Sequence, residues 1–190
     1  MKNIIVTTSV KTTLELNDTA QKLADELNLK YVKRNKTTIK QLLETTKGVI
    51  VVYKNKLSYF ENDSEFFFHL DTTALKIKNS DNEPLVEIIG KEKQSVLDCT
   101  MGLAGDSILL SYYGHNVTAI EKNKIIHLIT SNGLKNYVSP SEEINKAMRK
   151  IITYNYDCID YLKSTPDNSF DIVYFDPMFS HNIKESENLS

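Results

Sequence analysis

Four apolar segments in the second half of the chain end at or just before an acidic residue: Asp98, Glu121, Asp157 and Asp176. If the segments are parallel strands, these carboxylates meet at one edge of a sheet. Glu121 follows Asp98 by 23 residues, close to the interval of about 20 at which doubly wound folds place a carboxylate on ribose hydroxyls. Asp157 could accept a hydrogen bond from the amino group of adenine. The first three acids together predict an adenosine site, although each alone would fit a solvated cap or turn.

The loop after the first of these segments is rich in small residues. It runs Asp-Cys-Thr-Met-Gly-Leu-Ala-Gly-Asp from Asp98 to Asp106, so backbone N–H groups are free where the next helix starts. Gly102 and Gly105 would let a ligand approach closely. Thr100 replaces the first glycine of the dinucleotide motif G-x-G-x-x-G, which weakens the case for a pyrophosphate site. Acids without a phosphate-neutralising cation favour a cationic nucleoside such as S-adenosylmethionine (SAM) over NAD.

The last apolar segment ends in Asp176-Pro177-Met178-Phe179. This tetrapeptide resembles the Asp/Asn-Pro-Pro-Tyr/Phe motif of class I methyltransferases that act on amino nitrogens, with methionine in place of the second proline. Together with His181, it is similar to the small-subunit ribosomal RNA guanine-N2 methyltransferase J family, whose cofactor loop the segment 98–106 also resembles. The similarity covers roughly residues 66–182. The structural alternative is an ordinary Asp-Pro turn after a buried strand.

The resemblance implies a SAM-dependent methyltransferase with its cofactor at the strand ends. Gly105 and Lys122 stand where many relatives of this kind carry arginine, so those contacts would be made by backbone alone or lost. Cofactor contacts are expected at Asp98, Thr100, Gly102, Gly105, Asp106, Glu121, Lys122, Asp157, Cys158 and Asp176.

The same motif predicts the catalytic residues. The amino nitrogen of a nucleobase shares its lone pair with the ring, so its attack on a methyl group needs hydrogen-bond acceptors. Asp176 and the backbone carbonyl of Pro177 would supply them and stabilise the developing positive charge. Phe179 would stack on an unpaired base and fix the line of attack. Whether Asp176 also takes the proton stays open, because a carboxylate near a sulfonium is a weak base.

Strands and helices alternate after residue 80, which predicts right-handed βαβ units and a parallel sheet in a Rossmann-like α/β fold. Residues 1–80 predict a small N-terminal α/β domain, whose aromatics between 53 and 68 favour sheet packing over a base-stacking platform. Residues 81–190 form the expected methyltransferase domain. Strands are expected at 4–7, 49–53, 57–60, 65–69, 95–98, 117–121, 151–154 and 171–175, and helices at 16–27, from Thr38 to Gly48, near 84–89, and at 105–113, 124–135, 140–149 and 158–163.

A complete sheet of this methyltransferase class has seven strands. Four precede the end of the sequence, which comes fourteen residues after Asp176. The resemblance implies that the absent strands would carry part of the substrate wall. We therefore expect a truncated chain whose last strand is an exposed edge and whose own activity is doubtful.

The composition further narrows the classes of protein to which this chain can belong. The 190 residues, 41% hydrophobic and 25% charged, are typical of a globular protein. The two cysteines, Cys99 and Cys158, are not spaced for a disulfide framework or a zinc site, so we expect packing roles and no metal. No apolar run is long enough for a signal peptide or a membrane span, which predicts a cytoplasmic location and no membrane partner.

Two hypotheses follow. The first is SAM-dependent methylation of an exocyclic amino group in RNA, guanine N2 of small-subunit ribosomal RNA, with ribosomal RNA or the small subunit as partner. The second is a noncatalytic nucleotide- or RNA-binding module on the same scaffold. Amino methylation of DNA or of protein glutamine uses nearly the same turn, so residues 170–180 do not discriminate among these substrates.

A net charge of −2 gives no overall positive potential that would attract nucleic acid. The basic stretch 30–40 could bind phosphates or form a solvated edge, and His69 could line the substrate mouth or pack in a strand.

Overall fold

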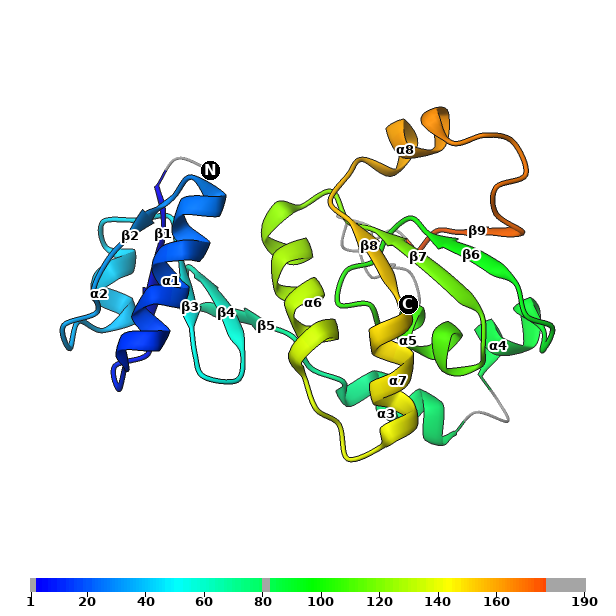
Figure 1. Cartoon of the computed structure of the whole chain (residues 1–190), viewed down its shortest axis with the longest axis horizontal. Helices are drawn as coiled ribbons and strands as arrows, with labels where there is room; N and C mark the ends of the chain where they lie inside the picture. The colour runs from blue at the N-terminus through cyan, green and yellow to red at the C-terminus, as the bar shows by residue number, and fades with distance from the viewer. Residues whose placement is uncertain (1–2, 80–82, 177–190) are drawn as a thin grey trace, which may run out of the picture.

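A computed structural model describes residues 3–79 and 83–176. These residues form two lobes, each built around its own β-sheet (Figure 1). The first lobe holds the blue and cyan part of the chain, and the second lobe holds the green to orange part.

The first lobe has a mixed five-stranded sheet of order β2-β1-β3-β4-β5. β1 is parallel to β2 and β3, whereas β4 and β5 continue as antiparallel strands. This matches the small α/β unit that the sequence predicts. The elements are β1 (Ile4–Thr8), α1 (Leu14–Leu27), β2 (Lys30–Tyr31), α2 (Ile39–Leu43), β3 (Gly48–Val52), β4 (Leu57–Glu61) and β5 (Ser64–Phe67).

Local signals set most helix ends in this lobe. Asn28 ends α1 in the left-handed conformation, with φ of 54°. Thr38 and Gln41 form the predicted capping box at the start of α2. The expected end of this helix at Gly48 was wrong, because α2 ends at Leu43 and Gly48 opens β3. A Cβ at Gly48 would overlap the ring of Tyr59 on the paired strand, so the glycine serves strand packing.

The second lobe has a parallel sheet of order β8-β7-β6-β9 among the described residues. The chain moves outward from β6 to β8 and then crosses to the other side of β6, which makes the carboxyl end of β6 a topological switch point. β9 lies at the edge of the described sheet. The elements are α3 (Asp71–Lys78), α4 (Pro84–Ile89), β6 (Ser95–Asp98), α5 (Gly105–Tyr112), β7 (Asn116–Ile120), α6 (Lys124–Asn136), α7 (Glu142–Lys150), β8 (Ile152–Tyr154), α8 (Cys158–Ser164) and β9 (Ile172–Tyr174).

Two details of this lobe differ from the sequence prediction. The helix expected from residue 140 begins at Glu142, because the side chain of Ser141 caps it by accepting from the N–H of Ile144; Pro140 precedes the helix. The helix α3 was not predicted. Its first turn has no side-chain cap at Leu70, so the usual sequence signal for a helix start is absent.

One buried apolar cluster joins the two lobes. It contains Val52 and Leu57 from the first sheet, Ile129 and Leu134 from α6, and Phe68 from the connecting segment. Phe68 is 6% exposed and packs edge-on against Tyr137. Shared burial of this kind favours a fixed arrangement of the lobes, since separating them would expose the cluster to water.

Substitution of Gly133 by alanine tests this junction. A methyl group there would overlap Cβ and Cγ of Phe68, so we expect Gly133→Ala to lower the free energy of unfolding by about 1–3 kcal/mol. In an exposed helix the same change stabilises by up to about 1 kcal/mol. Urea denaturation of the variant and of the exposed-site control Lys135→Ala measures the sign. An unchanged or higher stability would contradict the packing of Phe68 on α6.

Candidate functional site

A cleft of about 490 Å³ lies at the carboxyl edge of the second sheet, next to the switch point. We call it the strand-end cleft. The loops after β6 and β7, the end of β9 and the helix α3 form its walls, which is where open parallel sheets bind ligands. Of the ten residues predicted to contact a cofactor, all except Asp157 line it: Asp98, Thr100, Gly102, Gly105, Asp106, Glu121, Lys122, Cys158 and Asp176.

Asp98 lies at the floor of the cleft and is 2% exposed. Its carboxylate accepts hydrogen bonds from the hydroxyl of Ser107 at 2.6 Å and from the backbone N–H of Thr100 at 2.9 Å. Burial raises the pKa of this carboxyl to about 6, although both hydrogen bonds act in the opposite direction. The two hydrogen bonds of this carboxylate hold the loop between β6 and α5 in place.

Thr100 connects this loop to the end of β9. Its hydroxyl oxygen accepts a hydrogen bond from the backbone N–H of Asp176 at 2.8 Å. The connection runs through three residues, from Asp98 to Thr100 and on to Asp176. It holds the start of the Asp-Pro corner against the cleft.

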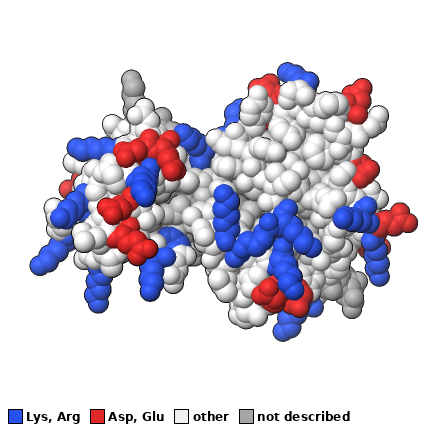
Figure 2. All heavy atoms as spheres, viewed as in Figure 1, with Lys and Arg blue, Asp and Glu red and all other residues white. Residues whose placement is uncertain are grey.

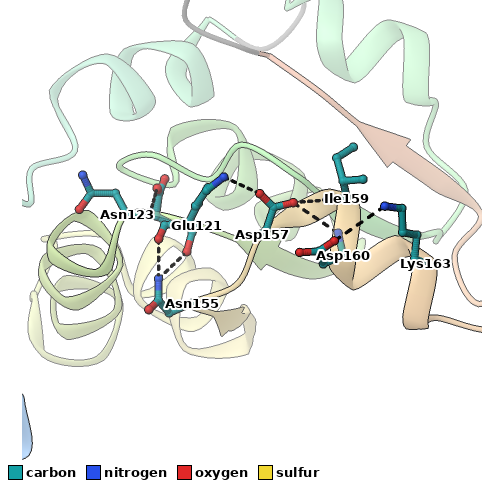
Figure 3. Close-up of polar contacts among 8 residues, drawn as sticks. Glu121, Asn123, Asn155, Asp157, Ile159, Asp160 and Lys163 are labelled. Atoms are coloured by element: carbon teal, nitrogen blue, oxygen red, sulfur yellow. Dashed lines mark hydrogen bonds and ion pairs between the residues drawn. The ribbon is translucent and has the colours of Figure 1, made fainter.

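Glu121, just after β7, joins the β6 loop to the loop that follows β7. One carboxylate oxygen accepts from the N–H of Gly102 at 3.2 Å and the other from the N–H of Asn123 at 2.7 Å. Asn155 donates to the backbone carbonyls of Glu121 and Lys122, so the loop after β8 is attached to the same point (Figure 3). A carboxylate has about four acceptor positions, which leaves capacity for hydroxyl groups of a ligand.

Asp157 contacts the start of α8 and the side chain of Lys122 (Figure 3). Its carboxylate caps α8 by accepting from the N–H groups of Ile159 and Asp160, and it forms an ion pair with Lys122 at 2.7 Å. The hydrogen bond from Lys122 lowers the pKa of Asp157. Its expected contact with adenine stays a prediction, because Asp157 itself is not among the residues that line the cleft.

The helix α3 adds cleft residues that the sequence did not indicate. Lys76 forms an ion pair with Asp106 at 2.7 Å, and the hydroxyl of Tyr174 on β9 donates to the other oxygen of Asp106 at 2.9 Å. The hydrogen bond to Asp106 raises the pKa of Lys76. Burial and the hydrogen bond to Asp106 raise the pKa of Tyr174. A pair 30 residues apart across two helices leaves no local signal in the sequence.

Glycine is favoured at the two loop positions, 102 and 105, for different reasons. Gly102 has φ of +51°, a left-handed conformation that favours glycine, whereas a Cβ there would meet little else. A Cβ at Gly105 would lie 3.0 Å from the hydroxyl of Thr73 on α3. Gly105 therefore lets α3 approach the start of α5 and complete the wall of the cleft.

Cys99 and Cys158 also line the cleft and are free thiols. Burial raises the pKa of Cys99 to about 12, so this thiol is neutral near neutral pH. Among the described residues, no group of three or more histidine, cysteine, aspartate or glutamate side chains is placed to hold a metal ion. Within the same part of the chain, no helix is both long and apolar enough to cross a lipid bilayer.

The geometry of the cleft agrees with a comparison across protein families. A family model described as "Putative SAM-dependent methyltransferase" matches residues 22–188. The chain belongs to this family. SAM is the cofactor of the family, and the Rossmann-like α/β architecture predicted from the sequence is confirmed.

Individual relatives of this methyltransferase support the same assignment. It is 36% identical over 195 residues to "Uncharacterized protein YpiP" of Bacillus subtilis strain 168, covering 98% of this chain and 76% of that protein. It is 29% identical over 169 residues to "Ribosomal RNA small subunit methyltransferase J" of Francisella tularensis subsp. holarctica, covering 87% of this chain and 65% of that protein. A SAM-dependent methyltransferase of Neisseria gonorrhoeae shares the fold, with a TM-score of 0.66 at 18% identity over 92% of this chain and 70% of that one.

The residues of the cleft fit SAM. Both lysines that line it, Lys76 and Lys122, are paired with aspartates, so neither is left to neutralise a pyrophosphate. Glu121 can accept from ribose hydroxyls, and the carboxylate of Asp176 adds negative charge that favours a sulfonium. The predicted catalytic residues Pro177 and Phe179 lie outside the described residues, and their roles stay predictions.

The pKa of Asp98 leads to a prediction about pH. A folded-state pKa of about 6 exceeds the value of about 3.9 in unfolded chains. The folded state therefore binds this proton more tightly, and the free energy of unfolding falls as pH rises from about 4 to 6, by up to about 3 kcal/mol. Asp98→Asn should remove this decrease. Urea denaturation at intervals between about pH 4 and pH 7 measures the slope for both proteins.

The comparison uses slopes, because the variant can also lose hydrogen-bond strength at every pH. Asp160→Asn changes a carboxylate that is 65% exposed and should retain the wild-type slope. Equal pH slopes for wild type and Asp98→Asn would contradict the effect of burial on this carboxyl.

Proposed function

We propose that this protein transfers the methyl group of SAM to an exocyclic amino group in RNA, namely guanine N2 of small-subunit ribosomal RNA. The observation that carries the proposal is the hydrogen bond from the N–H of Asp176 to Thr100, which holds the start of the Asp-Pro corner at the same cleft as Glu121. Similarity to ribosomal RNA small subunit methyltransferase J over 87% of the chain supports the RNA substrate. A cytoplasmic location accompanies this proposal.

Some residues of the chain hold the cofactor, and others act on the amino group of the substrate. Glu121 accepts hydrogen bonds from ribose hydroxyls, and the loop from Asp98 to Asp106 encloses the nucleoside. When bound, SAM supplies an electrophilic methyl group on a sulfonium. Asp176 accepts a hydrogen bond from the substrate amino group, which orients the nitrogen lone pair and stabilises the positive charge that develops on nitrogen. Pro177 and Phe179 would add an acceptor and a stacking surface, as the motif implies.

Replacement of Glu121 tests cofactor binding. A hydrogen bond to a charged group contributes about 1.5–3 kcal/mol, so we expect Glu121→Ala to weaken SAM binding at least about tenfold in isothermal titration calorimetry. Asp160→Ala removes an exposed carboxylate and should bind as the wild type does. An unchanged affinity of Glu121→Ala would exclude Glu121 from the ribose contact. RNA binding by a wild type without affinity for SAM would favour the noncatalytic module.

Replacement of Asp176 tests the chemical step. We expect Asp176→Asn to lower methyl transfer to ribosomal RNA by about 100-fold or more, because loss of a group that stabilises transition-state charge has effects of this size. SAM affinity should change far less. Incorporation of labelled methyl groups into ribosomal RNA that lacks the modification, followed by mass spectrometry of nucleosides, measures both rate and product. Full activity of the variant would contradict the assigned role, and methylated adenine in RNA, methylated DNA or methylated glutamine would identify a different substrate.

A further inference from the structure

A second cavity, of about 1320 Å³, lies between the two lobes. The start of α1, the turn between β3 and β4, the end of β5 and the end of α6 form its walls, at the waist that separates the lobes in Figure 2. We call it the interlobe groove. Pockets for single small ligands have about 300–1,000 Å³, so the groove has room for a segment of a polymer.

Aromatic rings and a lysine lie together in this groove. The ammonium of Lys56 is 4.0 Å from the ring centre of Phe67 and 5.3 Å from that of Tyr53. It also pairs with Glu65 at 2.9 Å, so that carboxylate is neutralised. Tyr53 and Phe67 are half-buried and line the groove, which fixes the rings while leaving part of each accessible. Fixed aromatic rings are the usual stacking surfaces for unpaired bases.

The charge of the groove suits an anionic chain. Lys11 and Lys54 line it, are exposed, and have no ion pair among the described residues. Because Lys56 is paired with Glu65, the two unpaired lysines face one described lining glutamate, Glu15. Asn132 on α6 contributes an amide, which can both donate to and accept from a base edge.

A further basic surface adjoins the groove. Figure 2 shows lysine and arginine side chains gathered over α6 and α7, beside the waist. The guanidinium of Arg149 on α7 donates to the carbonyl of Tyr137 at 2.6 Å, and Tyr137 lines the groove. Positive charge therefore extends from the groove onto the second lobe.

One short segment lines both cavities. Phe67, Phe68 and His69 face the interlobe groove, and Thr72, Thr73 and Lys76 face the strand-end cleft. Only two residues of the chain separate the last residue of the first set from the first residue of the second. The two cavities are therefore lined by neighbouring parts of one short segment.

We propose that the interlobe groove binds single-stranded RNA next to the target nucleotide, with bases stacked on Tyr53 and Phe67 and phosphates paired with Lys11 and Lys54. The proposal rests on the RNA substrate of the proposed function and adds a second binding site to it. The net charge of −2 does not oppose this, because the local charge at the groove is positive.

Fluorescence anisotropy with a labelled single-stranded RNA tests the groove. Tyr53→Ala should weaken binding at least about fivefold, through the loss of base stacking. Lys54→Ala should reduce the slope of log K against log salt by about 0.7, the value for one phosphate contact on a single strand. Lys54 is exposed in a turn, so this variant should fold even if Tyr53→Ala does not.

Matched controls lie away from the groove. Tyr112→Ala removes an exposed tyrosine on α5, and Lys163→Ala removes a lysine that is 74% exposed on α8; both should bind RNA as the wild type does. SAM affinity, measured by calorimetry, should be unchanged in all four variants. Wild-type RNA binding by the groove variants would overturn the proposal, as would equal affinity for duplex RNA, whose bases are not free to stack.

The outcomes also separate this proposal from the proposed function. RNA binding that depends on Tyr53 and Lys54, without methyl transfer, would support the groove and contradict the enzymatic assignment. Binding of SAM without measurable affinity for single-stranded RNA would contradict the groove and leave the cofactor site intact.

Discussion

The buried carboxylate of Asp98 sets the geometry on which the strand-end cleft depends. Removing a carboxylate from water is costly unless its oxygens find partners, and here both are occupied, by Ser107 on α5 and by the N–H of Thr100. These bonds restrict how the chain leaves β6. Since the hydroxyl of Thr100 holds the N–H of Asp176, the same constraint reaches β9. Sites that orient reacting groups need supporting contacts of this kind.

The helix α3 connects the first lobe to the strand-end cleft. It begins at Asp71, shortly after Phe68, which is buried between the lobes, and its Lys76 pairs with Asp106 in the cleft. The first lobe is thus connected to the cofactor wall by one short segment.

The sequence predicted the parallel sheet well because its signals are local. Ser95–Asp98 matches β6 at both ends, since an apolar run is followed at once by a turn of small residues. It also predicted that acids at successive strand ends would gather; Asp98, Glu121 and Asp176 line one cleft, whereas Asp157 is not among its lining residues. It could not show that Asp98 binds the loop, because burial depends on tertiary packing. Nor could it find Lys76, since α3 lacks a cap and its partner is distant in the chain.

The pKa of Cys99 has a consequence for the stability of the bound methyl donor. Only a thiolate is an effective nucleophile, and this sulfur sits in the wall of a cleft suited to an electrophilic sulfonium. With a pKa of about 12, this thiol is almost entirely protonated near neutral pH. Burial of Cys99 therefore lowers the fraction of thiolate that could compete with the incoming amine for the methyl group.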